Sequence, residues 1–139
     1  TAAMLARAEA PAEAITGAVL TVFHWIANPA LFNTALDFAV RDWARRSGKV
    51  RSLLDRSDAR RVEALTQMFI RYGYPDLEAM TRAKVLYYMQ LGYDMAEPNE
   101  SYAHRLEMTP QYLKVFTGRE PSAIELDEFS EFTRKHWDL

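Results

Sequence analysis

Few polar side chains in this sequence could do chemistry, and the most conspicuous ones lie among apolar neighbours. His24 interrupts the apolar run at residues 14–27, and Gln90 lies in the apolar half of the stretch at residues 76–96. A polar side chain in such a place is either a core group hydrogen-bonded to a carbonyl or an anchor in a ligand cavity, because cavities are mostly apolar with a few placed polar groups. The sequence leaves both interpretations open.

Patterns for catalysis and metal binding are missing from the sequence. The 3 histidines, His24, His104 and His136, are scattered, and none pairs with another ligand at the spacing of a metal-binding helix. There is no phosphate-binding glycine loop and no GxSxG turn, and with 0 cysteines a thiolate nucleophile or ligand is impossible. We therefore expect no enzyme activity, no metal and no cofactor.

Tyrosine and methionine side chains gather in the middle of the chain, with Tyr72, Tyr87 and Met68 among them. A buried tyrosine needs a partner for its hydroxyl, and methionine fills irregular apolar gaps, so both are common at cavities as well as in cores. We expect a pocket inside each subunit for a small, mostly apolar effector. Its predicted lining is Phe23, His24, Phe38, Met68, Phe69, Tyr72, Tyr87 and Gln90.

The stretch at residues 76–96 is the strongest signal for association. From Val85 onward it is apolar nearly all the way round, whereas a surface helix needs a polar face. The covering could come from the protein's own core, a ligand or a second subunit. We expect this helix and the last helix to form a homodimer through a four-helix arrangement. The predicted interface residues are Met89, Tyr93, Ile124, Leu126, Phe129 and Phe132.

The elements that must position these side chains are all predicted to be helices. Apolar spacing of three and four residues recurs along the chain, and strand patterns are nearly absent. The prediction is one all-α domain over residues 1–139, a bundle of about six or seven helices. The expected helices cover residues 11–27, 31–46, 49–55, 58–72, 76–96, 110–116 and 121 onward.

Helix boundaries follow from glycine, proline and capping residues. Asn28-Pro29 is expected to stop the first helix, and Ser47-Gly48 to end the second as a C-terminal cap. Gly73 is expected just past the end of the fourth helix. Thr109-Pro110 is expected to open the short helix near residue 110.

Composition and charge set limits on the partners. A net charge of −2 gives no general attraction to nucleic acid or to an anionic membrane, and the apolar run at residues 14–27 is too short to cross a bilayer. Residues 41–61 are basic, which we interpret as a solvated helix face. The lack of cysteine fits a cytoplasmic location.

The order of helices and a set of short motifs resemble the C-terminal regulatory domain of TetR-like (tetracycline-repressor family) transcriptional regulators. The likeness covers most of residues 11–96 and rests on the run FAVRDWARR at 38–46, Val50, DARR at 58–61, Leu65, GYP at 73–75, and the series Ala79, Ala83, Tyr87 and Gly92.

The resemblance implies an effector-binding and dimerisation domain of a bacterial repressor. In that family an N-terminal helix-turn-helix reads the operator as a dimer. We find no such segment before Pro11, so we expect this chain to be the regulatory half, with DNA bound only by a domain absent from it. The alternative is a stand-alone helical dimer that binds a lipophilic molecule or a partner helix and has no DNA role.

Overall fold

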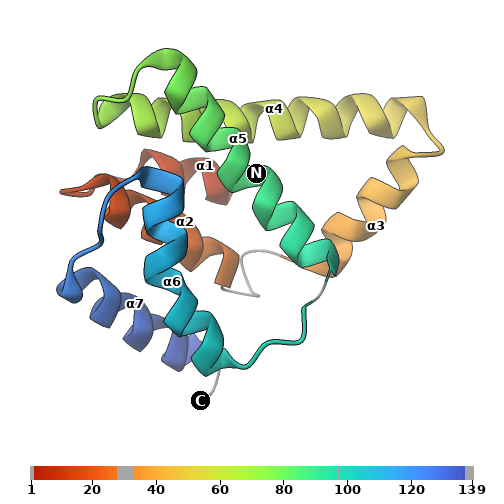
Figure 1. Cartoon of the computed structure of the whole chain (residues 1–139). Helices are drawn as coiled ribbons and strands as arrows, with labels where there is room; N and C mark the ends of the chain where they lie inside the picture. The colour runs from red at the N-terminus through yellow and green to blue at the C-terminus, as the bar shows by residue number, and fades with distance from the viewer. Residues whose placement is uncertain (1, 28–32, 97, 137–139) are drawn as a thin grey trace.

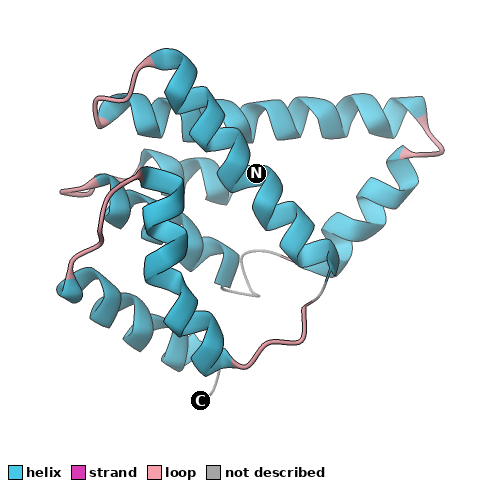
Figure 2. Cartoon of the chain, in the orientation of Figure 1, coloured by secondary structure: helices cyan, strands magenta, loops and turns pink. Residues whose placement is uncertain are grey.

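A computed structural model of the chain describes residues 2–27, 33–96 and 98–136, without the side chains of residues 25–27 and 136. This part of the chain contains seven helices and no strand, which confirms the predicted all-α class (Figure 2). The boundaries predicted at Asn28-Pro29 and at Leu31 lie outside the described residues. None of the described helices is long and apolar enough to cross a membrane.

Helix α2 lies at the centre of the body (Figure 1). It packs against α1, α4, α6 and α7, whereas α3 packs on α4 away from that body. The helices are α1 (Ala2–Glu9), α2 (Ile15–Ala27), α3 (Thr34–Ala44), α4 (Gly48–Arg71), α5 (Asp76–Ala96), α6 (Tyr102–Thr117) and α7 (Ala123–His136).

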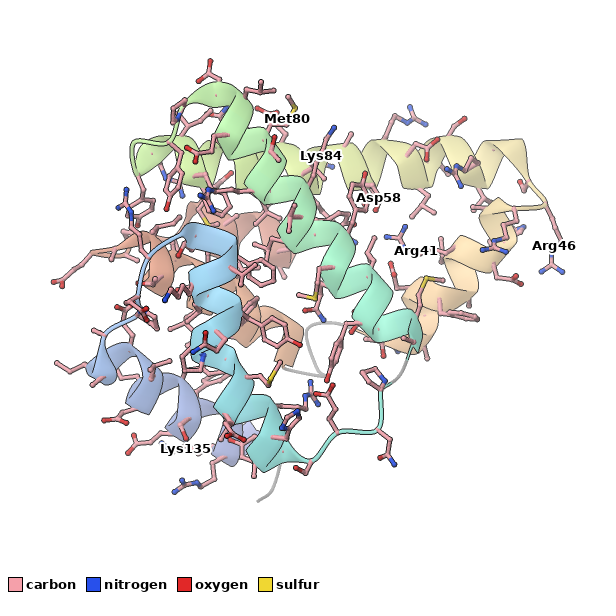
Figure 3. All side chains as sticks on the ribbon, in the orientation of Figure 1. Arg41, Arg46, Asp58, Met80, Lys84 and Lys135 are labelled. Atoms are coloured by element: carbon pink, nitrogen blue, oxygen red, sulfur yellow. The ribbon has the colours of Figure 1, made fainter. Side chains whose placement is uncertain are left out.

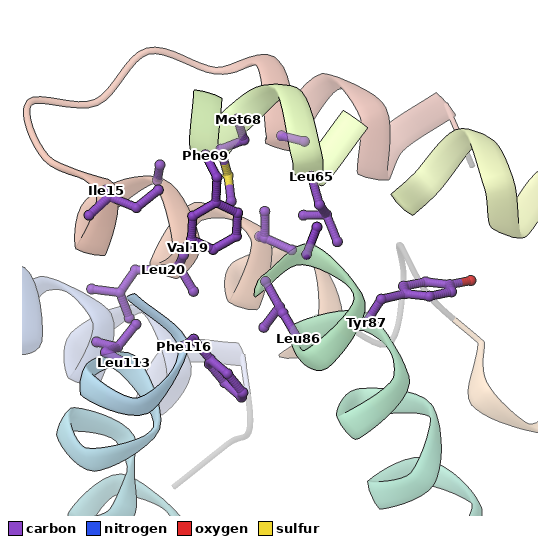
Figure 4. Close-up of a cluster of buried hydrophobic side chains, with 14 of the residues drawn as sticks. Ile15, Val19, Leu20, Leu65, Met68, Phe69, Leu86, Tyr87, Leu113 and Phe116 are labelled. Carbon is purple, nitrogen blue, oxygen red and sulfur yellow. The ribbon is translucent and has the colours of Figure 1, made fainter. Parts of the chain in front are cut away.

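The core forms where α2, the second half of α4, the first half of α5 and α6 meet (Figure 4). Ile15 and Val19 of α2, Phe69 of α4 and Leu113 of α6 are each 0 % exposed. Burying a side chain of this size contributes roughly 1.5–3 kcal/mol relative to leaving it in water. The first half of α4 adds only Leu54 to the buried apolar residues, so it reaches beyond the core.

The α4–α5 turn has the geometry that its sequence predicts. Gly73 has φ +90°, a conformation that costs other residues a steric clash. Its N–H donates to the carbonyl of Ile70, and the N–H of Tyr74 donates to the carbonyl of Phe69. The Tyr74 hydroxyl in turn donates to the Thr117 carbonyl at the end of α6, which fixes the hairpin on the body.

The α3–α4 connection differs from the prediction. Ser47 is the N-cap of α4, because its hydroxyl accepts the N–H of Val50, and Gly48 is the first helical residue. Helix α3 already ends at Ala44. The predicted break between residues 55 and 58 is also wrong, since α4 runs without interruption from Gly48 to Arg71 and nothing at those positions opposes a helix.

Helix α6 is longer than expected at its start. Ser101 is the N-cap and accepts the N–H of His104, so Thr109-Pro110 lies inside the helix and does not open it. The Thr109 hydroxyl donates to the carbonyl of Arg105 one turn earlier. Helix α1 was not predicted, and the helix predicted from residue 11 starts at Ile15 instead.

Helix α7 begins with a reciprocal cap that also joins it to α2. The Ser122 hydroxyl accepts the N–H of Glu125, and the Glu125 carboxylate accepts the N–H of Ser122. The same carboxylate accepts the hydroxyl of Thr16 at 2.8 Å. A Cβ at Gly17 would lie 3.2 Å from Oε2 of Glu125, so the lack of a side chain there lets the two helices come this close.

Candidate functional site: an ionic cluster beside an apolar groove

Five polar side chains meet where α3, α4 and α5 come together, and Arg41 of α3 is the centre of the group. Its Nε donates to Asp37 at 2.8 Å, and its two terminal nitrogens donate to the two oxygens of Asp58 on α4 at 2.9 and 2.8 Å. Figure 3 shows Arg41 and Asp58 between the two helices. A bidentate arginine–carboxylate pair of this kind fixes orientation as well as distance. Arg41 therefore determines how α3 sits on α4.

The hydroxyl of Tyr87 brings α5 into the same cluster. It donates to Oδ1 of Asp58 at 2.5 Å and accepts a hydrogen bond from Arg61 at 3.1 Å. Arg61 also lies 3.9 Å from Oδ1 of Asp37, a distance that suits an ion pair but exceeds a hydrogen bond. We call Asp37, Arg41, Asp58, Arg61 and Tyr87 the ionic cluster.

The surroundings shift the pKa values of the cluster in consistent directions. Burial, together with the bond to Asp58, raises the pKa of Tyr87 to about 12. Burial opposes the charged form of Asp58, but hydrogen bonds from Arg41 and Tyr87 outweigh it and lower the pKa of that carboxyl. The bond to Asp58 also raises the pKa of Arg41.

These shifts have a consequence for stability. A carboxyl with a lowered pKa stabilises the fold above the ordinary aspartate pKa of about 4. That stabilisation is lost only as the pH falls through the lower pKa of the folded state, so the Asp58 contact between α3 and α4 is expected to survive mild acid and to weaken below the ordinary aspartate range.

An open groove of about 600 Å³ runs between α3 and α4 beside the cluster. It is mostly apolar, and we call it the α3–α4 groove. Its lining is Asn33, Leu36, Asp37, Val40, Trp43, Ser47, Lys49, Val50, Leu53, Leu54, Ser57 and Arg61. Asp37 and Arg61 belong to both the groove and the cluster.

A second open groove, of about 500 Å³, lies between α5 and α6. Leu77, Val85 and Val115 on its walls are 73, 48 and 69 % exposed. Its two charged side chains, Glu78 and Arg82, bind each other at 3.2 Å, and Arg82 also donates to the Phe116 carbonyl at 3.0 Å. The groove therefore offers apolar surface more than a polar anchor.

The structure distributes the eight predicted pocket residues over separate places. Met68 and Phe69 are 0 % exposed in the core, and Phe23 packs against it. His24 lies between the rings of Phe129 and Phe132, with centroids 5.3 and 4.1 Å away. These residues do not line either of the two grooves described above, so their role in ligand binding stays a prediction.

The other four predicted pocket residues serve different contacts. Tyr72 donates its hydroxyl to the Ala12 carbonyl, Tyr87 belongs to the ionic cluster, and Phe38 is 53 % exposed on α3. Gln90 donates to Asp94 at 3.0 Å, and burial raises the pKa of that carboxyl. Only Tyr87 reaches the site that the structure points to.

Most of the predicted dimer-interface residues face their own chain. Phe129 is 8 % exposed, Phe132 stacks on His24, and Met89 and Leu126 pack against the core. Tyr93 lies beneath Arg105 at 5.4 Å. Ile124, at 71 % exposed, remains available to a partner, so a dimer contact by α7 stays a prediction for this residue.

Sequence reasoning missed the ionic cluster although a local signal existed. Asp37 and Arg41 are four residues apart, the spacing of an ion pair on one helix face. Arg41 and Arg61 were instead interpreted as parts of a solvated basic face, whereas Arg61 is 9 % exposed.

No group of three histidine, aspartate or glutamate side chains that could hold a metal occurs among the described residues. Comparisons of the chain with known protein families, with curated proteins and with solved structures found no match.

Proposed function

We propose that this chain is the effector-binding and dimerisation domain of a TetR-like transcriptional repressor. The observation that carries the proposal is the outer face of α5, the helix that the sequence singles out as apolar nearly all round from Val85 onward. Its inner face is buried through Ala79, Ala83 and Leu86. The outer face exposes five apolar side chains at helical spacing: Leu77 at 73 %, Met80 at 39 %, Val85 at 48 %, Tyr88 at 53 % and Met95 at 44 %.

The five exposed apolar side chains on this 21-residue helix favour association, and the exposed Thr81 and Lys84 lie on the same face. A second copy presents the same face, so two α5 helices related by a two-fold axis would cover each other. Val115 of α6 is 69 % exposed beside Val85 in the α5–α6 groove, which extends the apolar surface beyond one helix. This surface replaces α7 as the main element of the proposed interface.

The ionic cluster supports the regulatory part of the proposal. It joins α3 and α4 to α5 through Tyr87, and the ring of Tyr87 lies 5.6 Å from that of Tyr88 on the outer face. A ligand that changes the spacing of α3 and α4 would thus act on the helix that carries the interface. The proposed mechanism is a population shift, in which the effector binds one arrangement of the dimer more tightly than another.

Sedimentation velocity tests the proposed interface. At ~10 μM, where interfaces of standard size and affinity stay closed, we expect the mass of a dimer. Replacing Tyr88 by aspartate should give a monomer, because two new charges would face each other across the two-fold axis. The matched control is Ile124→Asp, which places the same charge at an exposed apolar site on α7.

Circular dichroism should show that both variants remain helical, since both sites are exposed. A wild-type monomer at this concentration would refute dimerisation. If Ile124→Asp dissociates the dimer and Tyr88→Asp does not, the interface lies on α7 and not on the outer face of α5.

A further inference from the structure

We propose that the α3–α4 groove binds an acidic amphipathic helix of a partner protein. The apolar side of that helix would lie on Leu36, Trp43 and Leu53, and its acidic side along a row of cations on α4. The inference goes beyond the proposed function and does not depend on it, because the groove includes no residue of α5. It depends on the exposed apolar walls, on the small core between α3 and α4, and on the spacing of the cations.

The walls of the groove leave large apolar side chains in water. Leu36 is 61 %, Trp43 58 % and Leu53 54 % exposed, and all three line the same space. On α3, Leu36, Val40 and Trp43 follow at intervals of four and three residues, so they lie on one face of the helix. A second helix covers such a face with an apolar stripe of its own.

Helix α3 and the first half of α4 have almost no core of their own. Among the described residues 34–60, only Ala44 and Leu54 are buried apolar side chains. Helix α3 has 11 residues, and a helix of this length is marginal in water unless an apolar face is packed. A third helix in the groove would supply that packing.

A row of cations borders the groove on α4. Lys49 and Leu53 line the groove, and Arg56 and Arg60 follow on the same face at intervals of three and four residues. Lys49, Arg56 and Arg60 are all exposed, and we call them the cationic row.

The cationic row lacks acidic partners in the described part of its own chain. None of the ion pairs found there includes Lys49, Arg56 or Arg60. Glu63, one turn beyond the row, accepts a hydrogen bond from Gln67 at 2.9 Å. Arg56 and Arg60 are four residues apart, an arrangement that destabilises a helix by like-charge repulsion. Carboxylates of a partner would relieve this repulsion.

The length of the cationic row selects a helix over a small molecule. At 1.5 Å per residue, the row from Lys49 to Arg60 spans about 16 Å along α4. One head group cannot reach all three cations, whereas carboxylates three, four or seven residues apart on a parallel or antiparallel helix repeat at the same intervals. Apolar anchors would then give the affinity, and the charges would set the orientation of the partner and its rate of association.

Two other anionic surfaces fit the groove less well. The DNA backbone could neutralise the cationic row, but it offers no apolar group to cover Leu36, Trp43 and Leu53. An anionic membrane is flat on this scale, whereas the groove lies between two helices. Neither surface would cover the apolar walls.

Fluorescence anisotropy with three labelled synthetic peptides tests the class of partner. Each has about 18 residues, or about 27 Å as a helix, enough to follow the whole row. The acidic peptide carries leucines at intervals of three and four residues and glutamates on one flank. The basic peptide has lysines in place of the glutamates, and the scrambled peptide keeps the acidic composition without the leucine stripe.

We expect saturable binding of the acidic peptide below ~100 μM at ~50 mM salt, with one site per chain. The basic and scrambled peptides should bind about tenfold more weakly or worse, since each lacks one of the two complementary features. No saturable binding of the acidic peptide, or equal binding of either control peptide, would overturn the proposal.

Two aromatic residues of α3 test the location. Trp43→Ala removes the largest side chain of the groove wall and should weaken binding of the acidic peptide by about tenfold or more. Phe38→Ala is the matched control, because Phe38 is 53 % exposed on the same helix but does not line the groove. Unchanged binding by Trp43→Ala, or equal loss in the control, would place the peptide elsewhere and refute the proposed site.

A pair of double variants tests the charges. Arg56→Gln with Arg60→Gln should weaken binding about fivefold at ~50 mM salt, and by less as salt screens the charges. The control, Arg134→Gln with Lys135→Gln, changes the net charge equally at exposed positions of α7, away from α3 and α4 (Figure 3). Equal weakening in both would show that only net charge matters and would contradict a role for the cationic row.

Competition separates the partner helix from the other anionic surfaces. Neither a random DNA duplex nor phosphatidylserine vesicles should displace the acidic peptide at ~150 mM salt. Displacement by either one from the wild type, lost in the Arg56 and Arg60 double variant, would assign the cationic row to that surface and overturn the proposal.

Discussion

At the scale of single residues, Tyr87 is the group on which three helices depend. Its ring lies on α5. Its hydroxyl donates a hydrogen bond to Asp58 of α4 and accepts one from Arg61 of the same helix, and Asp58 in turn binds Arg41 of α3. The tyrosine is 7 % exposed, so water cannot easily take over these bonds. One hydroxyl group thus bonds to three charged side chains, Asp58 and Arg61 of α4 and Arg41 of α3.

Replacing Tyr87 by phenylalanine should lower the free energy of unfolding by about 1–3 kcal/mol. The substitution keeps the ring but removes a hydroxyl bonded to three charged groups, which leaves Asp58, Arg61 and Arg41 less well satisfied. Urea unfolding followed by circular dichroism measures the change.

The adjacent tyrosine supplies the control for this experiment. Tyr88 is 53 % exposed, so Tyr88→Phe should change the stability of the monomer by less than about 0.5 kcal/mol. Equal effects of the two substitutions would show that the cluster does not stabilise the junction of the helices.

The sequence predicts Tyr87 as a functional residue but not its partners. Arg41 and Asp58 are 17 residues apart, and Arg41 and Tyr87 are 46 apart. Their meeting depends on how α3 folds back on α4, which periodicity does not specify. The same limit explains why Phe69 and Met68, predicted to line a ligand pocket, lie in the core and line neither of the two grooves.

At the scale of elements, helices with strong periodicity are predicted well and their junctions are not. Helix α5 matches its expected range of 76–96, because Pro75 and the C-terminal break leave little choice. Ser47-Gly48 can end one helix or begin the next, and the choice depends on whether Val50 is helical. Ser101 is the N-cap of α6, so the helix begins well before Pro110, the residue from which its start was predicted.

Replacing the glycine at the α4–α5 turn and the glycine at the α3–α4 turn by alanine should change the free energy of unfolding in opposite directions. Gly73 has φ +90°, so Gly73→Ala should lower the free energy of unfolding by about 1–2 kcal/mol. Gly48 is helical with nothing within 4 Å of an added Cβ, so Gly48→Ala should raise it by up to about 1 kcal/mol. Urea denaturation of both variants checks the signs, and destabilisation by Gly48→Ala would mean that α4 does not begin there.

At the scale of the whole molecule, the basic stretch at residues 41–61 presents less unpaired positive charge to solvent than its composition suggests. Arg41 faces inward, Arg46 pairs with Asp42 at 2.9 Å, and Arg51 pairs with Asp55 at 3.0 Å. Non-specific affinity for DNA comes from cations that neutralise phosphates. The net charge of −2 acts in the same direction.

We therefore expect this chain alone not to bind duplex DNA at ~150 mM salt, where counterion release contributes little. Fluorescence anisotropy with a random duplex measures it. The control neutralises Arg45, Arg46 and Lys49 together, exposed residues around the α3–α4 turn. Saturable micromolar binding that this triple variant abolishes would show that the basic surface has a function of its own.

The length of α4 gives the molecule a mechanical property. At 1.5 Å per residue its 24 residues span about 36 Å, from the core at one end to the groove and α3 at the other. A helix of this length moves as a stiff rod, so a tilt of about 5° at the core end would displace the far end by about 3 Å. Motions too small to disturb the packing of Phe69 can thus displace α3 and the groove together relative to the body.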